Sequence, residues 1–138
     1  MLLIKNVWTV FLRFVSADVD EDSHVSMGLF GAAGKLLDDV VLYQYEYETL
    51  MECIDWFECY LRDPFYYRLE PARLAYRSIF WFRATAHEHL RRAWEIVTIL
   101  EERDVFMRMI KTEMPGYIIY EDNEQVLAYP YADIRRLL

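Results

Sequence analysis

His87, Glu88 and His89 form the cluster in this sequence that most resembles a catalytic or metal site, because imidazoles and carboxylates serve as general bases and zinc ligands. All three fall within residues 71–103, a run without an internal Gly or Pro that is predicted to be one long helix. Residues two apart on a helix point about 200° apart. The two imidazoles therefore cannot share one metal ion, and we expect a surface or capping role for them, with no metal, cofactor or catalytic residue.

Cys53 and Cys59 are the two cysteines of the chain, and they lie six positions apart in a predicted helix. This spacing places them on different faces, too far apart for an unstrained disulfide. We expect free thiols, no zinc site and a reducing cytoplasm. Lys5 and Arg13 interrupt the apolar N-terminal stretch, so a signal peptide is not expected either.

Basic and aromatic residues share a second sector of the predicted helix 71–103. Arginine and aromatic side chains together can bind anions or stack on bases, but the net charge of −8 is wrong for direct nucleic-acid binding. We expect these guanidiniums to face the acidic helix before them, or its copy in a second subunit. The alternative is a small enzyme or anion-ligand-binding protein that uses this sector. Its members are Arg73, Arg77, Arg83, His87 and Arg91.

Tyrosines and carboxylates gather between residues 43 and 55. The tyrosines alternate with polar residues, which indicates a short extended segment before the next helix. The carboxylates then lie on one face of that helix, where like charges repel. Because tyrosine offers a large contact area at low entropy cost, we interpret the set as a partner-binding patch. Partial burial of the tyrosines in the core is the competing interpretation. The set consists of Tyr43, Tyr45, Tyr47, Glu48, Glu52 and Asp55.

The negative charge is unevenly distributed along the chain. Residues 1–63 carry 12 acidic and 4 basic side chains, whereas residues 64–138 carry 11 of each. Glu121 and Asp122, at the tip of a predicted hairpin, could extend the negative surface. Such a surface can steer a basic partner, although solubility alone would also account for it. We hypothesise an acidic, non-enzymatic domain of inhibitor or immunity type that binds a basic protein partner and no membrane, with a structural homo-oligomer as a further alternative.

Hydrophobic periodicity predicts the elements that must position these residues. Apolar side chains at helical spacing predict helices at 27–39, 48–62 and 71–103, and alternation after residue 103 predicts a three-stranded antiparallel meander over 105–129. A β-branched and aromatic run predicts a strand at 7–15. The apolar stripe of the longest helix comprises Ile79, Phe82, Ala86, Leu90, Ala93, Val97 and Leu100. We therefore predict a single α+β domain of 138 residues, with the N-terminal strand and the meander packed against about three helices.

The helix predicted at 48–62 carries a second apolar edge. Cys53, Trp56 and Tyr60 lie beside its main stripe, so the helix is either packed on two sides or binds a partner.

Short motifs are spread over the chain from Gly28 onward: Gly28-Leu29-Phe30, Trp56-Phe57, Trp81-Phe82 with Ala86, Glu88-His89, Pro115-Gly116, Tyr120-Glu121-Asp122 and Gln125-Val126. This combination resembles a group of small uncharacterised bacterial proteins to which no activity is attached. The resemblance implies a bacterial, cytoplasmic protein and assigns no functional residue.

Overall fold

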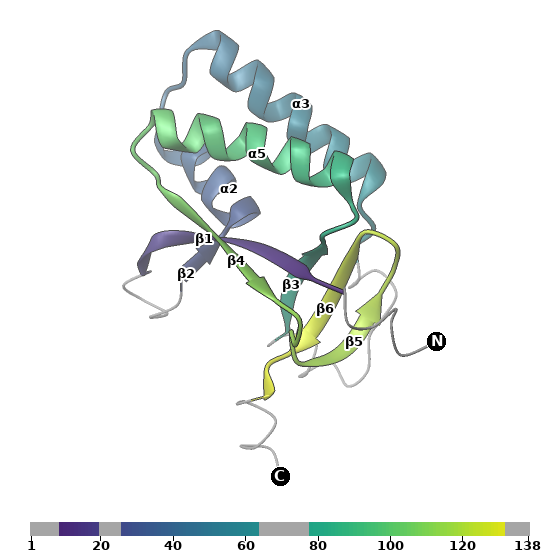
Figure 1. Ribbon diagram of the computed structural model, residues 1–138. Helices are drawn as coiled ribbons and strands as arrows, with labels where there is room; N and C mark the ends of the chain where they lie inside the picture. The colour runs from purple at the N-terminus through teal and green to yellow at the C-terminus, as the bar shows by residue number, and fades with distance from the viewer. Residues whose placement is uncertain (1–8, 20–25, 64–77, 132–138) are drawn as a thin grey trace. The chain divides into compact units, whose positions relative to one another are not determined.

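The computed structural model describes residues 9–19, 26–63 and 78–131, and this part of the chain contains three helices and six strands (Figure 1). The class is α+β, as predicted. The chain forms two compact units, which we describe separately, and the single domain expected from its length stays a prediction. In the described part, unit 1 comprises 9–13, 61–63, 78–87 and 111–131, and unit 2 comprises 14–19, 26–60 and 88–110.

Antiparallel strands build unit 1. Strand β3 (Ile79–Arg83) lies between the first residues of β1 (Phe11–Val19) and β6 (Gln125–Tyr129). On its other side β6 pairs with β5 (Tyr117–Glu121), so β6 is a central strand, and all five of its residues are buried. The last two strands of the predicted meander are therefore confirmed as a hairpin.

The first strand of the predicted meander has a different partner. Strand β4 (Met107–Thr112) pairs with β1 rather than with β5. Next to this pairing, the backbone N–H of Ala17 donates to the carbonyl oxygen of Phe106 at 2.9 Å. Alternation along a sequence predicts that a segment is extended, but it does not fix which strand will be its neighbour.

The predicted helix at 71–103 is wrong in its first half. Residues 79–83 form β3, and helix α5 (His87–Glu102) begins only after a turn. Residues 71–77 lie outside the described residues. The segment Ile-Phe-Trp-Phe-Arg is β-branched and aromatic, which favours a strand. Because short apolar runs satisfy the helical and the strand periods equally well, Ile79 and Phe82 were misassigned to the helical stripe.

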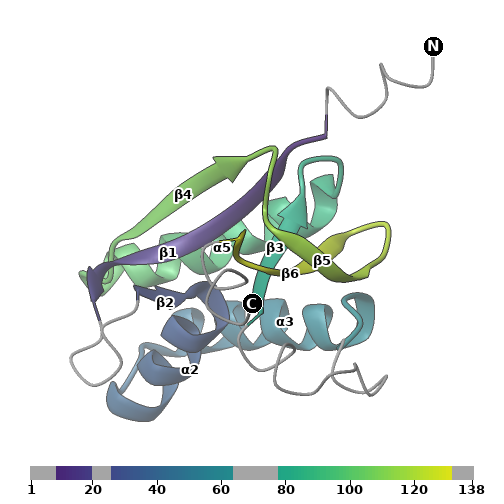
Figure 2. The same cartoon turned by 90° about the horizontal axis from the view of Figure 1, so that it is seen from below.

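Unit 2 contains α2 (Leu29–Asp39), α3 (Gln44–Tyr60) and α5 from Glu88 onward, together with β2 (Ser26–Gly28), most of β4 and the rest of β1. Figure 2 shows β1 and β4 side by side, and β1 also pairs antiparallel with β2. Helices α3 and α5 run antiparallel, because the contacts between them join Glu46 to Arg103, Cys53 to Glu95, Trp56 to Arg92 and Tyr60 to His89.

The boundaries of α3 change the secondary structure that was predicted for the tyrosines. Helix α2 is close to the predicted 27–39, but α3 begins at Gln44, before the predicted 48–62. Tyr45 and Tyr47 therefore belong to the first turns of a helix, and the extended segment predicted for them is wrong.

The helical stripe is confirmed in the second half of 71–103. Ala93, Val97 and Leu100 are buried in α5, whereas Leu90 is half-buried and His89 is buried beside it. In the part of the chain that the structure describes, no helix is long and apolar enough to cross a membrane.

Candidate functional site

A buried carboxylate fixes the N-terminal end of α3. The backbone N–H of Tyr43, which precedes the helix, donates to Oε1 of Glu46 at 2.9 Å, as in one half of a capping box. Arg103, just beyond α5, donates through Nε to Oε2 of Glu46 at 2.9 Å and pairs with Oε1 through a second nitrogen. The side chain of Glu46 is 2% exposed, and the hydrogen bond from Arg103 lowers the pKa of its carboxyl below the ordinary 4.5. The start of α3 is therefore tied to the end of α5.

Three exposed tyrosines surround this fixed end. Tyr43, Tyr45 and Tyr47 are 68%, 59% and 52% exposed, so the interpretation that placed them partly in the core is wrong. The rings of Tyr43 and Tyr45 stack with a centroid distance of 6.2 Å, and the guanidinium of Arg103 lies 5.0 Å from the centroid of Tyr43. The hydroxyl of Tyr45 donates to Oε2 of Glu102 at 3.4 Å. These contacts orient two of the three rings while leaving them open to solvent.

Exposed carboxylates continue along the same side of α3. The helix contains no Lys or Arg, and among the described residues none of these carboxylates forms an ion pair with a basic side chain. Glu58 extends the predicted set, and its i+3 spacing from Asp55 is the signal that could have revealed it. We call the following exposed residues the acidic face: Tyr43, Tyr45, Tyr47, Glu48, Glu52, Asp55 and Glu58.

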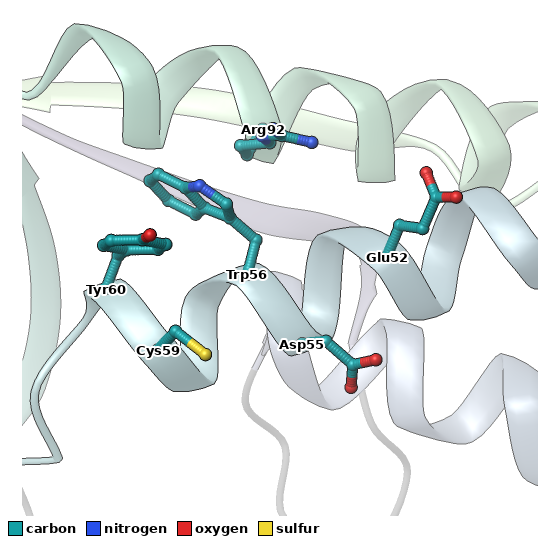
Figure 3. Close-up of a pocket in the computed structure, with 6 residues that line it drawn as sticks. All are labelled: Glu52, Asp55, Trp56, Cys59, Tyr60 and Arg92. Carbon is teal, nitrogen blue, oxygen red and sulfur yellow. The ribbon is translucent and has the colours of Figure 1, made fainter.

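A groove with a volume of about 440 Å³ lies beside the acidic face, between α3 and α5. Figure 3 shows two aromatic rings toward one end of the groove and two carboxylates toward the other, with one guanidinium reaching in from α5. The groove combines an apolar wall, negative charge and a thiol. It is lined by Glu52, Asp55, Trp56, Cys59, Tyr60 and Arg92.

Trp56 is the centre of this groove, and its neighbours hold its ring. The indole lies 4.9 Å from the ring of Tyr60 and 4.7 Å from that of His89, measured between centroids. On α5, the guanidinium carbon of Arg92 lies 5.4 Å from the Trp56 centroid, and Nε of Arg92 is 3.4 Å from Oε1 of Glu88. The sequence places Arg92 four positions after Glu88, which predicts an ion pair within one helix and nothing more. Sequence analysis therefore missed its place in the groove, because that place depends on the packing of α5 against α3.

The histidines take separate roles. Nε2 of His89 lies 2.8 Å from the carbonyl oxygen of Tyr60, and because a carbonyl only accepts, this nitrogen donates. Tyr60 is the last residue of α3, so His89 caps the C-terminal end of that helix, where carbonyls lack helical partners. The capping role is confirmed for His89, which is buried, whereas His87 is exposed at the start of α5.

The basic sector predicted on one long helix does not form. Arg83 lies on β3 in unit 1, where it donates to the carbonyl oxygen of Asp122 at 2.7 Å and pairs with Glu121 at 2.9 Å. Arg91 lies on α5 in unit 2 and pairs with Glu88 and Glu95 of its own helix. The other members of the set, Arg73 and Arg77, lie outside the described residues. Pairing of guanidiniums with acidic groups thus occurs, but within the described ranges the arginines that contact α3 from another element are Arg92 and Arg103.

Asp122 organises the β5–β6 turn. Its Oδ1 accepts the backbone N–H groups of Glu124 and Gln125 at 2.9 and 3.0 Å, and its Oδ2 accepts from the hydroxyl of Tyr120 at 2.8 Å. Asp122 therefore has a structural role, and Glu121, the other acidic residue predicted at this tip, is engaged by Arg83.

Both cysteines are free thiols, as predicted. Cys53 is buried, and its Sγ donates to Oε2 of Glu95 at 3.1 Å. Burial, followed by the hydrogen bond and charge of Glu95, raises the pKa of Cys53 to about 12. Cys59 is exposed in the groove. Within the described ranges, no group of three or more His, Cys, Asp or Glu side chains could hold a metal ion.

Comparison of the chain with protein families, with curated proteins and with solved structures found no match.

Proposed function

We propose that this chain is an acidic, non-enzymatic protein-binding domain that docks on a basic protein partner through the acidic face. The observation that carries the proposal is the composition of α3: its exposed side presents carboxylates and tyrosines, and the helix itself contains no Lys or Arg that could neutralise them. Such a concentration of like charge costs helix stability, since Glu48 and Glu52 repel at i,i+4 spacing. A binding role accounts for that cost.

The two kinds of side chain on the acidic face would act at different stages of binding. Carboxylates at a rim raise the association rate by attracting a basic surface over about a Debye length, roughly 10 Å at 0.1 M salt. Tyrosines contribute contact area that is lost on dissociation, so they set the lifetime of the complex. Tyr43 and Tyr45 are already oriented by Arg103 and Glu102, which reduces the entropy lost on binding.

The most concrete form of this function is an inhibitor or immunity-type protein of a bacterial cytoplasm. A reducing compartment is consistent with two free cysteines. The negative charge of α3 disfavours contact with nucleic-acid phosphates and with anionic membrane surfaces. It also disfavours a homo-oligomer built on this face, because two copies of α3 would bring like charges together.

The anion-binding or enzymatic alternative gains no support from the described residues. Arg83 and Arg91 each pair with carboxylates, so their charges are already matched. We therefore carry forward the protein-binding proposal alone.

The experiment is affinity capture of proteins from a bacterial lysate with the wild-type chain and with Glu48→Lys/Glu52→Lys as bait, followed by purification of the captured protein and measurement of its binding. A basic protein that binds the wild type at low salt and binds the charge-reversed chain about tenfold more weakly supports the proposal. In the same assay, Tyr47→Ala should mainly raise the dissociation rate. A partner that is acidic, or one that binds both baits equally, would refute it.

A further inference from the structure

The groove beside the acidic face has the chemistry of a binding site for a cationic side chain. We call this candidate binding site the socket. Glu52, Trp56 and Tyr60 are spaced at i, i+4 and i+8 on α3, so they form one row along the helix. Asp55 and Cys59 form the adjacent row. The aromatic rings stand toward one end of the groove and the carboxylates toward the other (Figure 3).

The aromatic end of the groove suits the aliphatic stem of a Lys or Arg side chain, and the carboxylate end suits its charged head. The long aliphatic stem packs on aromatic surface, and the charged head is attracted both by the faces of aromatic rings and by carboxylates. Tyr60 is 62% exposed, so much of its ring is free to receive a stem. No Lys or Arg of the described residues pairs with Glu52 or Asp55, so both carboxylates can take an external cation.

The groove is also formed in advance of binding. Trp56 is held between Tyr60, His89 and the guanidinium of Arg92, and His89 itself is buried and hydrogen-bonded to the end of α3. A ligand would therefore not need to order the aromatic wall, which lowers the entropy cost of binding.

We propose that this shallow groove receives one Lys or Arg side chain of the basic partner, as an anchoring contact of the interface. The inference rests on the proposed function and adds the position of its central contact. A contact between the α3 helices of two copies of the chain is disfavoured, because α3 has no basic residue to offer. An anion is disfavoured because Arg92, the one cation that lines the groove among the described residues, lies over Trp56 and beside Glu88, with Glu52 and Asp55 sharing the groove.

The test is an NMR titration of the full chain at about 20 mM ionic strength, where charge interactions are weakly screened. The probes are the blocked peptides tetra-lysine, tetra-arginine, tetra(acetyl-lysine) and tetra-glutamate. The signal is the indole N–H peak of Trp56, identified by its absence from the spectrum of Trp56→Phe. We expect tetra-lysine and tetra-arginine to shift this peak, and the neutral acetylated peptide to leave it in place.

Two double variants of α3 remove the same charge and provide the matched control. Glu52→Gln/Asp55→Asn alters the groove, whereas Glu48→Gln/Glu58→Gln alters exposed carboxylates outside its lining. We expect the first pair to weaken tetra-lysine binding by about fivefold or more and the second by less than about twofold. Tyr60→Ala should weaken binding as well, and its exposed ring makes it a mild change for the fold.

The other outcomes separate this inference from the proposed function. If both double variants weaken tetra-lysine binding equally, or if no cationic peptide shifts the Trp56 peak, the inference that the groove binds a cation is wrong. The proposed attraction of a basic partner to the acidic face would still stand. A shift of the Trp56 peak with tetra-glutamate that is lost in Arg92→Gln would show that the groove binds an anion. A shift on raising the protein concentration alone would show that it binds a second copy of the chain. If tetra-lysine occupies the socket but a captured partner ignores Glu48→Lys/Glu52→Lys, the proposed function fails and the cation site remains.

Discussion

At the residue scale, the backbone at Gly116 leaves no room for a side chain. Its φ is 129°, and a Cβ at this position would lie 2.2 Å from the carbonyl oxygen of Tyr129. We expect Gly116→Ala to lower the free energy of unfolding by about 3 kcal/mol or more, because strain and a backbone clash add. Denaturant unfolding measures this change.

Gly34 supplies the control for that substitution. A Cβ there would meet nothing within 4 Å, and Gly34 lies inside α2. Gly34→Ala should therefore raise the free energy of unfolding by up to about 1 kcal/mol, through helix propensity. A Gly116→Ala variant as stable as the wild type would contradict the backbone conformation described here.

The two thiols should differ sharply in reactivity. Only a thiolate attacks a disulfide reagent. The pKa of Cys53 is raised to about 12 and its side chain is buried, whereas Cys59 is exposed. With Ellman's reagent at about pH 8, we expect one thiol per native chain to react quickly and none in Cys59→Ser, with both reacting in denaturant. Rapid reaction of Cys53 in the native chain would show that α3 and α5 do not enclose it.

The carboxylates of the acidic face could be predicted from the sequence, because exposed polar residues on a helix follow from the hydrophobic pattern of its other side. The exposure of Tyr45 and Tyr47 could not, since the sequence predicted an extended segment where the structure has the first turns of α3.

The groove between α3 and α5 could not be predicted from the sequence. Trp56 and Tyr60 were visible only as an ambiguous apolar edge, and Arg92 reaches Trp56 from another helix. Asp122 is the reverse case, because the sequence predicted that it binds a partner. In the structure its carboxylate instead accepts hydrogen bonds from backbone N–H groups of its own turn.

At the scale of the elements, α5 ends with a strained residue. Asp104 has a φ of 62°, the N–H of Asp104 bonds the carbonyl of Glu101, and that of Val105 bonds the carbonyl of Leu100. This is a Schellman motif, in which glycine fits best and a negative charge opposes the helix dipole.

Asp104→Gly should therefore raise the free energy of unfolding by about 1 kcal/mol. Thr98→Gly, at an exposed position inside α5, serves as the opposite case, because glycine in a helix interior should lower the free energy of unfolding by roughly 0.5 to 1 kcal/mol. Thermal unfolding compares the two variants, and a destabilised Asp104→Gly would mean that the carboxylate itself supports the cap.

The tie between α3 and α5 should make stability depend on pH. The pKa of Glu46 is lowered in the folded chain, so its carboxylate contributes stability that is complete above the ordinary value of 4.5 and is lost as the pH falls through the lower folded pKa. We expect Glu46→Gln to be less stable than the wild type at neutral pH and to lose less stability on acidification.

Glu101→Gln is the control for this measurement, since Glu101 is exposed in the last turn of α5. It should follow the wild-type profile. Identical acid profiles of urea unfolding for Glu46→Gln and the wild type would exclude a stabilising pair with Arg103.

The elements that the sequence predicted well are those with one clear period. Helix α2, the second half of 71–103, and strands β5 and β6 were predicted with the right type, since neighbouring residues favour the same structure. The four apolar and aromatic residues of 79–83 are too few to separate the helical from the strand period, which is why the helix predicted there is wrong.

The start of α3 was predicted too late because the alternation of Tyr43, Tyr45 and Tyr47 resembles a strand. The cap made by Glu46 and its tie to Arg103, 57 positions away, are seen only in the structure.

At the scale of the whole molecule, the central claim is that charge acts locally, through α3, and not through the net charge of −8. Glu48→Lys/Glu52→Lys and Glu101→Lys/Glu113→Lys change the net charge equally, and all four positions are exposed. Only the first pair lies on α3. The two variants therefore separate local recognition from general attraction.

The most direct test is the association rate of the captured basic partner with the wild type and with these two variants, from about 20 mM to about 300 mM salt. The account predicts that Glu48→Lys/Glu52→Lys lowers the association rate at low salt about tenfold and flattens its salt dependence, while Glu101→Lys/Glu113→Lys stays within about twofold of the wild type. Equal slowing by both variants, or unchanged rates in the α3 variant with binding lost instead on Arg91→Ala, would contradict it.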